Sequence, residues 1–437
     1  MKNLLIISVI FLIFYSASSK QYGKFLVIND AHLDKNYKEG GTVQCDSPCA
    51  CCCDDMPPSN YTGQTAGKWG SSKCNTPFRL FEQVIPVVQQ QQIDFVVFLG
   101  DAPSMAFWEV TYEDSISYVK YVAQQLAKLV DIPVVPVIGN HDYSPSDFFT
   151  CDGSMDNYYK TMADIYKQWL PSDIASFHHC GWYSNSIIPG LRFLIMNTMI
   201  CDPADILILH ESEEMTEQCK WLDSEIQKAK DNGEKVYLFG HVPIGQSTQR
   251  IYPPLCWTNS SLKIAQLMEK YPDTIVSMFS GHTHFSEFRV VYDTKTSKIP
   301  VGMNLISPSF VPEASRYSGF RIYDYNTQSF EITNIHQWYS NPYSVGDDQI
   351  PVWEKHFDFL SDYKDYGVEK VNPSELDKIA KQITTNEDLF KLYYQRYAPR
   401  WNVDSVTEAK KNLIKCSLPV TKNSIYTECL NKLNSEK

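Results

Sequence analysis

The sequence predicts a mixed α/β fold, and three observations lead to this prediction. The 437 residues are 43% hydrophobic and 21% charged, which is typical of a chain that buries a sizeable core. Between residues 24 and 279, short apolar runs alternate with segments of helical periodicity. Beyond residue 288, shorter runs of alternating polarity follow one another without a long helix between them, so the sheet is expected to be mixed.

The predicted elements follow this pattern along the chain. We expect strands over residues 24–28, 95–99, 134–138, 191–196, 235–239 and 275–279, with helices over 78–92, 116–130, 213–230 and 262–271. Four shorter strands are expected over 288–292, 302–306, 320–325 and 330–335. From residue 353 onward the pattern turns helical, with helix starts near Ser374 and Asn386. We therefore expect a main domain over 20–340 and a C-terminal helical region over 341–437 that packs on it.

The first 19 residues have the pattern of a secretory signal peptide. Lys2 gives a charged start, residues 4–14 are apolar except for Ser8, and small residues follow over 16–19. Eleven apolar residues would cover about half of a hydrocarbon core of about 30 Å, so a signal is favoured over a membrane anchor. No later run approaches the roughly 18 apolar residues of a spanning helix. The mature protein is therefore expected to be secreted or to reside in a lysosomal or endosomal lumen.

The cysteine pattern agrees with an oxidising compartment. Of the thirteen cysteines, six gather in one loop over 45–74, namely Cys45, Cys49, Cys51, Cys52, Cys53 and Cys74. A zinc module would need paired C-x2-C units or a nearby histidine pair, and the sequence has neither, so a disulfide knot is favoured over metal binding. Cys416 and Cys429 are placed to close a loop, and the odd total leaves at least one thiol unpaired. The glycosylation sequons at Asn60 and Asn259 fit the same location.

The charge balance argues against a nucleic-acid partner. The chain has 39 Lys and Arg against 51 Asp and Glu, a net charge of −12. Proteins that bind nucleic acid rely on clustered Lys and Arg to neutralise phosphates, and the sequence has no such cluster. We therefore expect no nucleic-acid partner.

Polar residues suited to bind metal follow five of the predicted strands. After the first strand come Asp30 and His32, which leave it on the same face because strand side chains alternate. The other strand ends carry Asp101, then Asn140 with His141, then His241, and finally His282 with His284. Ligands bind beyond the carboxyl ends of strands in open α/β sheets, which is where all five motifs lie. A glycine stands before four of these residues and permits a sharp turn and a close backbone approach to an ion.

Each of these motifs is weak alone, because Asp-x-His and Gly-Asp pairs are common in turns and caps. Together they supply four His, two Asp and one Asn, which are enough donors for two ions if one Asp bridges. Half of the ten histidines of the chain lie in these motifs. The sequence therefore predicts a metal centre with two ions.

The ordered set of motifs resembles the calcineurin-like metallophosphoesterases over roughly residues 22–340. Four segments are similar to the acid sphingomyelinase branch: DAHLDKNY over 30–37, SKCNTP over 72–77, GNHDYSP over 139–145 and GHTHFSEF over 281–288. The C-terminal region with Cys416 and Cys429 also resembles that branch. The chain departs from acid sphingomyelinase itself because its first predicted strand follows the signal without an intervening saposin domain. The resemblance implies a two-sheet α/β/β/α sandwich with a mostly helical C-terminal region.

The resemblance also assigns roles to the motif residues. It implies that Asp30, His32, Asp101 and His284 hold one ion, and that Asp101, Asn140, His241 and His282 hold the other. Imidazole and carboxylate donors suit Zn²⁺, so two Zn²⁺ ions are expected. The purple acid phosphatases would have a tyrosinate ligand three residues after the bridging Asp, where this chain has Ser104.

A histidine that is not needed as a ligand is expected to take part in the reaction. His141 is implied to donate a hydrogen bond to the phosphate or to protonate the leaving alkoxide. A second such histidine is expected four residues after the bridging Asp, where this chain has Met105. Leaving groups that need strong protonation are then expected to react more slowly.

The function implied is a secreted or lumenal dizinc phosphodiesterase that hydrolyses sphingomyelin-like phosphodiesters to ceramide and phosphocholine. One alternative is a nucleotide phosphodiesterase or pyrophosphatase of the sphingomyelinase-like type, because a phosphate leaving group needs little acid help. An alternative of another class is a non-catalytic lipid-binding protein on the same fold. The expected partners are a sphingolipid or nucleotide substrate and peripheral contact with a lipid surface, and the protein is expected to be a monomer without a transmembrane segment.

Overall fold

The structure, a computed structural model, describes residues 21–43, 52, 62–208, 213–312, 316–343, 345–346, 348–398 and 403–435. The predicted signal peptide over 1–19, the sequon at Asn60 and much of the cysteine-rich loop lie outside these residues. Asn259, the other sequon, is exposed near the start of a helix. None of the described helices combines the length and the apolar character needed to cross a membrane.

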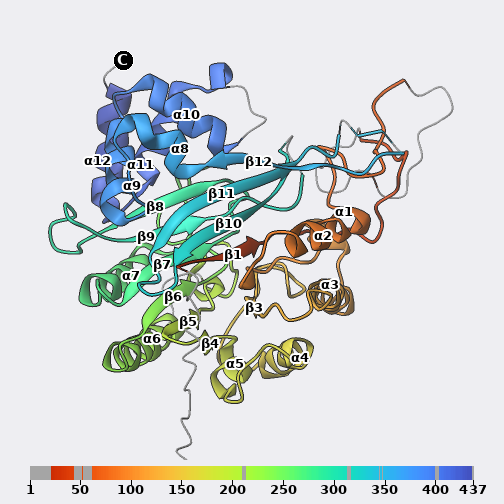
Figure 1. The fold of residues 1–437 in the computed structure, drawn as a ribbon, viewed down its shortest axis with the longest axis horizontal. Coiled ribbons are helices and arrows are strands. Elements are labelled where there is room, and N and C mark those ends of the chain that lie inside the picture. Colours follow the sequence, from red (N-terminus) through yellow and green to blue (C-terminus); the bar gives the residue numbers. More distant parts are fainter. Residues whose placement is uncertain are drawn as a thin grey trace, which may run out of the picture.

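The described strands form two sheets, and the predicted mixed α/β fold is confirmed (Figure 1). The six-stranded sheet has the order β12-β11-β10-β1-β2-β3, and the seven-stranded sheet has the order β13-β8-β9-β7-β6-β5-β4. The strands of the first sheet are β1 (Tyr22–Ile28), β2 (Phe95–Phe98), β3 (Val134–Pro136), β10 (Ser318–Asn326), β11 (Ile332–Ser340) and β12 (Trp353–Asp358). Those of the second are β4 (Tyr183–Ile188), β5 (Leu191–Ile195), β6 (Lys235–Phe239), β7 (Ile275–Ser280), β8 (Glu287–Tyr292), β9 (Pro300–Ile306) and β13 (Pro419–Val420).

Each sheet combines parallel and antiparallel pairs. β1, β2 and β3 are parallel neighbours, and so are β5, β6 and β7. β10, β11 and β12 continue the first sheet with antiparallel pairing. The parallel strands carry the predicted motifs, so their carboxyl ends lie at matching edges of the two sheets.

Aromatic side chains fill the space between the sheets. The ring of Phe25 on β1 stacks on Phe95 of β2 at 4.7 Å and on Tyr323 of β10 at 4.9 Å. The same ring meets the edge of Phe279 on β7, in the other sheet, at 5.4 Å. All four side chains are fully buried. Ring pairs of this kind stabilise the core beyond the area that they bury.

Helices cover the outer faces of the sheets, which gives the expected layered sandwich (Figure 1). The helices of the main domain are α1 (Phe78–Glu82), α2 (Val84–Gln89), α3 (Tyr112–Leu126), α4 (Asp156–Tyr166), α5 (Ala175–Cys180), α6 (Glu213–Asp231) and α7 (Thr258–Lys270). The C-terminal helices are α8 (Phe359–Tyr363), α9 (Pro373–Gln382), α10 (Glu387–Tyr397), α11 (Glu408–Ser417) and α12 (Asn423–Ser435). They gather at one end of the molecule in Figure 1, and α9 packs against β8 and β9.

Most predicted elements are present, and one of the differences has an identifiable cause. The predicted helix over 78–92 is divided at Gln83 into α1 and α2. Pro86 has no N–H to donate to the carbonyl of Glu82, four residues earlier, so one continuous helix is interrupted there. The strand predicted over 330–335 instead runs from Ile332 to Ser340, and α4, α5 and β4 were not predicted.

The prediction of helix from residue 353 onward is wrong for β12. Trp353 and Phe357 are its buried apolar residues, and their spacing of four fits one face of a helix and one face of a strand equally well. Pairing with β11 decides in favour of a strand. β12 extends the first sheet beyond residue 340, so this sheet continues past the predicted boundary. The predicted domain limits 20–340 and 341–437 stay a prediction.

Disulfides lie both in the main domain and in the C-terminal region. The described pairs are Cys52–Cys74, Cys151–Cys180, Cys201–Cys256 and Cys416–Cys429. The predicted closure of the C-terminal loop by Cys416 and Cys429 is confirmed, and Cys52–Cys74 places a disulfide in the cysteine-rich loop. The knot as a whole remains a prediction. Cys219 on α6 is a free thiol.

Peptide mapping without reduction should recover the peptide that links Cys52 to Cys74, before and after chelation. Cys219 should react with a thiol reagent only slowly in the native protein, because burial raises its pKa to about 11 and leaves little thiolate at neutral pH. Denaturation should make it react fully. A thiol at Cys52 or Cys74 that becomes reactive only after chelation would instead indicate a metal site in this loop.

Candidate metal centre

The predicted ligands meet beyond the carboxyl ends of β1, β2, β3, β6 and β7. His32 and His284 are remote in the sequence, yet their Nε2 atoms lie 3.1 Å apart. His241 Nε2 lies 3.2 Å from Asp101 Oδ2. All the residues predicted as ligands therefore belong to one cluster, which parallel strands with a common edge produce.

One group of donors surrounds Asp30 Oδ1. His284 Nε2 lies 3.3 Å from this oxygen and His32 Nε2 lies 3.9 Å from it. His32 Nε2 is also 3.5 Å from Asp101 Oδ2. These three residues, Asp30, His32 and His284, offer ligand atoms close enough together to share one ion.

A second group of donors surrounds Asn140 Oδ1. His241 Nε2 lies 2.9 Å from this oxygen and His282 Nδ1 lies 3.0 Å from it. The amide of Asn140 is held in this orientation because its Nδ2 donates to Asp147 Oδ1 at 2.9 Å. Asp101 Oδ2 faces both groups, since it contacts His32 of the first and His241 of the second.

The protonation pattern of the cluster fits a divalent cation. His32 Nδ1 lies 2.9 Å from the carbonyl oxygen of Pro103 and must donate to it, so a neutral ring has a lone pair on Nε2, which faces the centre. Asp30 Oδ1 is buried and has no hydrogen-bond donor. The lone pair of His32 Nε2 and the oxygen of Asp30 both face the centre, where a cation would make their contacts favourable.

The pKa shifts of the clustered side chains also favour a positive charge at their centre. Burial alone would raise the pKa values of Asp30 and Asp101, but the neighbouring imidazoles outweigh it and hold both pKa values well below the usual range. Burial lowers the pKa of His32 and of His282 to about 3. Burial would also lower the pKa of His241, but Asp101 outweighs it and raises this pKa to about 10. A proton on His241 thus balances carboxylates that a metal ion would otherwise neutralise.

The backbone of the cluster is held in conformations that side chains rarely adopt. Asp30, Asp101 and His284 have φ values of +49°, +62° and +63°, in the left-handed region. Such conformations persist at functional sites because the surrounding structure enforces them. Gly139 has no room for a side chain, because a Cβ there would clash with the carboxylate of Asp101. Glycine at this position therefore permits the close approach of the Asp101 carboxylate, whereas the predicted approach of the backbone to an ion stays a prediction.

Two supporting carboxylates were not predicted from the sequence. Asp142 is fully buried and accepts hydrogen bonds from the backbone N–H groups of Gly139 (2.7 Å), Ala102 (2.9 Å) and Asp101 (3.1 Å). It thereby ties the loop after β2 to the loop after β3. Asp147 orients Asn140, as described above. Asp142 directly follows the Gly-Asn-His motif, and this adjacency was the one signal that could have identified it.

His141 lies beside the ligands. Its ring centroid is 4.9 Å from that of His32, and its backbone N–H donates to Asp101 Oδ1 at 2.8 Å. Its side-chain Nδ1 has no hydrogen-bond partner. His141 also forms a candidate metal-binding group with His32 and Asp101. Met105, on the loop after Asp101, is half-buried and anchors through its backbone N–H to Asn75 Oδ1 at 3.1 Å.

The C-terminal region contacts the loop that carries His284. The carbonyl of Tyr397, at the end of α10, accepts from the backbone N–H of Ser286 at 3.1 Å. Its ring stacks on Phe285 with centroids 4.3 Å apart. Arg316 covers the ring of Phe285 at 4.5 Å and places Nη2 3.3 Å from His284 Nδ1. Sequence periodicity gave no signal for these contacts, which join segments that are remote in the chain.

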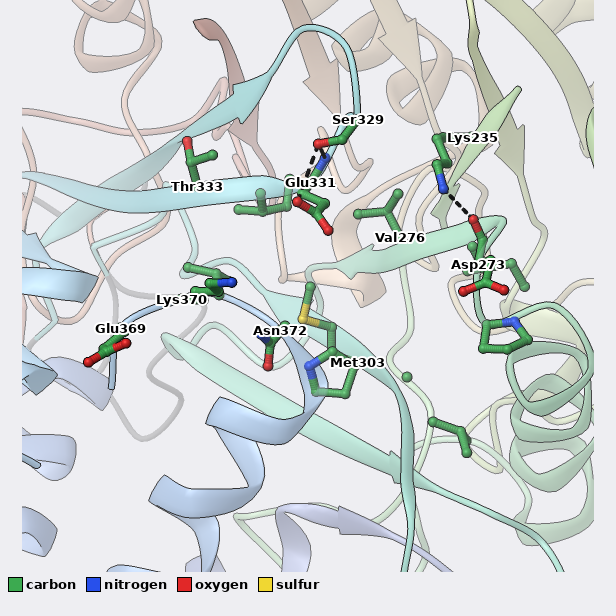
Figure 2. Close-up of a pocket in the computed structure, with 17 residues that line it drawn as sticks. Lys235, Asp273, Val276, Met303, Ser329, Glu331, Thr333, Glu369, Lys370 and Asn372 are labelled. Carbon is green, nitrogen blue, oxygen red and sulfur yellow. Dashed lines mark hydrogen bonds between the residues drawn. The ribbon is translucent and has the colours of Figure 1, made fainter. Parts of the chain in front are cut away.

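A separate cavity of about 430 Å³ lies away from this cluster (Figure 2). It is lined by residues such as Lys235, Asp273, Met303 and Glu331, and by the loop that precedes α9. Lys235 and Ile275 begin β6 and β7, so the cavity lies at the amino ends of the strands whose carboxyl ends carry His241 and His282. The described residues that line it include no histidine or cysteine, and it adds nothing to the metal centre.

Comparison with known proteins identifies two family models along the chain. Residues 23–286 match the model described as calcineurin-like phosphoesterase, and residues 301–436 match the model of the acid sphingomyelin phosphodiesterase C-terminal region. The chain is similar to sphingomyelin phosphodiesterase of Bos taurus, with 30% identity over 69% of this chain and 48% of that protein. It is similar to sphingomyelin phosphodiesterase A of Dictyostelium discoideum, with 28% identity over 93% of this chain and 68% of that protein.

One relative is named for a different substrate, and the match to this chain covers more of that relative's length. Cyclic GMP-AMP phosphodiesterase of Homo sapiens is 26% identical over 94% of this chain and 90% of that protein. The chain thus spans about half the length of the bovine relative and most of the length of this one.

Proposed function

This chain belongs to the calcineurin-like phosphoesterase family, and from that premise we propose that it is a metal-dependent phosphodiester hydrolase of the sphingomyelin phosphodiesterase type. The observation that carries the proposal is the position of Asp101, whose Oδ2 lies 3.5 Å from His32 Nε2 and 3.2 Å from His241 Nε2. One carboxylate that faces two groups of donors is the arrangement that a centre with two metals requires.

The proposed ligands divide between two ions. The first ion is held by Asp30, His32, Asp101 and His284, and the second by Asp101, Asn140, His241 and His282. Both are proposed to be Zn²⁺, because imidazole and carboxylate donors suit this ion. When bound, such a pair polarises the phosphoryl oxygens and lowers the pKa of water, which supplies a nucleophile near neutral pH.

His141 is proposed to handle the proton of the leaving group. Its free Nδ1 and its place beside His32 support this role. The backbone N–H of His141 donates to Asp101 Oδ1, which holds this residue beside the ligands. The imidazole can then donate to the alkoxide as the ester bond breaks, without being needed as a ligand.

The substrate is proposed to be a sphingomyelin-like phosphodiester, cleaved to ceramide and phosphocholine. The match of residues 301–436 to the acid sphingomyelin phosphodiesterase C-terminal region supports this choice. The protein is further proposed to act as a monomer in a secreted or lysosomal setting, with Asn60 and Asn259 glycosylated. The disulfides support the compartment, because such bonds persist in an oxidising environment.

A nucleotide phosphodiester or pyrophosphate is the second candidate substrate. Met105, at a place where an acid-donating histidine was expected, favours leaving groups that need no proton. The similarity to cyclic GMP-AMP phosphodiesterase over most of both chains points the same way. A non-catalytic lipid-binding role is disfavoured, because the proposed ligands form one cluster in which neighbouring donor atoms lie as close as 2.9 to 3.2 Å.

Assays of the purified protein on sphingomyelin and on a panel of nucleotides, with and without added Zn²⁺ after chelation, test the proposal. We expect hydrolysis that is lost on chelation and restored by Zn²⁺. Faster turnover of sphingomyelin supports the first substrate and faster turnover of a nucleotide supports the second. No hydrolysis of either class by protein that carries its metal would contradict the enzyme itself.

Replacing Met105 with His should raise the rate on sphingomyelin relative to nucleotide pyrophosphates, by up to roughly 10²-fold. An added imidazole can protonate a ceramide alkoxide, whereas a phosphate leaving group gains little from it. The ratio of kcat/KM for the two substrates measures the effect, and Met105→Leu is the control that changes packing without adding a proton donor. Equal changes for both substrates would show that Met105 serves packing alone.

A further inference from the structure

Asp202 is a buried carboxylate beside the metal centre that belongs to none of the predicted motifs. It follows η2 (Met199–Cys201), in the loop after β5, and only 1% of its surface is exposed. Its Oδ1 accepts from the backbone N–H of Ala204 at 2.8 Å. Its Oδ2 is buried without a hydrogen-bond partner. A buried carboxylate oxygen without a donor is costly, so a specific role is expected for it.

The imidazole of His282 faces this free oxygen. His282 Nε2 lies 3.8 Å from Asp202 Oδ2, and among the described residues no other basic side chain forms an ion pair with Asp202. The other ring nitrogen, Nδ1, lies 3.0 Å from Asn140 Oδ1. The two nitrogens of one ring thus face different groups: Nδ1 faces the proposed second ion, and Nε2 faces the carboxylate.

We propose that Asp202 is a positioning residue for the metal ligand His282, accepting a hydrogen bond from its Nε2–H. A proton held on Nε2 leaves the lone pair on Nδ1, which is the atom that faces the centre. A carboxylate in this position also makes the imidazole a stronger donor to a metal. The contact closes to hydrogen-bond length with a movement of about 1 Å. The proposal rests on the proposed function only in requiring a metal ion at Asn140 and His282.

The surroundings of both residues keep them in place. The backbone N–H of Asp202 donates to the carbonyl of Met199 at 2.9 Å, and the preceding residue forms the Cys201–Cys256 disulfide. On the other side, the backbone N–H of His282 donates to Asp30 Oδ2 at 3.0 Å. The loop after β5 therefore contributes to the centre through His282, although it carries no ligand of its own.

Asp205, three residues further along the same loop, offers a matched control. It is equally buried, with 1% of its surface exposed, but both of its oxygens are satisfied. Oδ2 accepts from the backbone N–H of Phe149 at 2.8 Å, and Oδ1 accepts from that of Leu207 at 2.9 Å. Its removal should therefore affect the stability of the loop without acting on His282.

The test compares the full-length variants Asp202→Ala, Asp202→Asn and Asp205→Asn with the wild type. Zn²⁺ affinity is measured by competition with a chromophoric chelator, and unfolding temperature is measured with the metal removed. Asp202→Ala should weaken one of two Zn²⁺ sites by about 10- to 100-fold, as is typical when such a partner is lost. Asp202→Asn should lose less, because its amide oxygen still accepts a hydrogen bond. Asp205→Asn should unfold at a lower temperature while both Zn²⁺ affinities stay unchanged.

Two outcomes would overturn the role of Asp202. One is wild-type Zn²⁺ affinity at both sites in Asp202→Ala and Asp202→Asn. The other is an equal loss of affinity in Asp202→Ala and Asp205→Asn, which would reveal a general effect of a weakened loop. A wild-type protein that binds no Zn²⁺ would instead contradict the proposed metal centre, so the two failures are distinguishable.

Discussion

Asp101→Asn should lower the metal content of the protein and abolish its turnover. The carboxylate of Asp101 faces both groups of ligands, at 3.5 Å from His32 Nε2 and 3.2 Å from His241 Nε2. Asparagine keeps the shape of the side chain but carries no charge, so it cannot bridge two cations. In the wild type, Oδ1 of Asp101 accepts a hydrogen bond from the backbone N–H of His141, which leaves Oδ2 for the metals. The loss should exceed the roughly 10²- to 10⁴-fold that one general acid contributes.

Elemental analysis and rate measurements on the same preparation check this result. Asp94→Asn is the matched control, because Asp94 precedes β2 at its amino end while Asp101 follows it at the carboxyl end. Asp94 accepts from the backbone N–H of Lys24 at 2.8 Å, remote from the ligands, so its loss should reduce stability alone. Two zinc equivalents together with normal activity in Asp101→Asn would contradict the assignment of Asp101 as the ligand that bridges the two ions.

The location of the site could be predicted from the sequence because one physical rule governs it. Strands that run parallel end at a common edge, so polar residues after each apolar run are brought together whatever their separation in the chain. Asp30 and His284 are 254 residues apart, yet they form one of the short contacts of the cluster, at 3.3 Å. The residue types then indicate the chemistry, since imidazole and carboxylate groups at one point suit a metal.

The supporting residues could not be predicted in the same way, because their role depends on distance rather than on pattern. Asp147 and Asp202 stand in loops where aspartate is common, and nothing in the sequence separates them from Asp205. Tyr397 reaches the loop of His284 from a helix more than a hundred residues later. The sequence of β12 predicts a helix because the spacing of Trp353 and Phe357 fits the period of a helix as well as that of a strand. Only pairing with β11 distinguishes the two alternatives.

His141→Ala should keep both metal ions and lose rate by roughly 10²- to 10⁴-fold on substrates with an alkoxide leaving group. His141 lies beside the ligands with Nδ1 unpartnered, and its removal leaves the contacts between Asp101, His32 and His241 in place. What is lost is the proton that the departing oxygen needs. The loss should therefore shrink to about tenfold or less on a nitrophenyl phosphodiester, because nitrophenolate leaves without protonation.

The comparison of leaving groups separates a proton donor from a ligand or a structural residue. His179→Ala is a suitable control, because His179 is an exposed histidine on α5, outside the cluster, and its loss should change neither rate nor metal content. His141 also lies in a geometric group with His32 and Asp101, so a direct ligand role makes a different prediction. In that case His141→Ala would lose metal and would slow both classes of substrate equally. An equal loss on both with two zinc equivalents retained would instead assign His141 to binding of the phosphate, because that contact is needed whatever group departs.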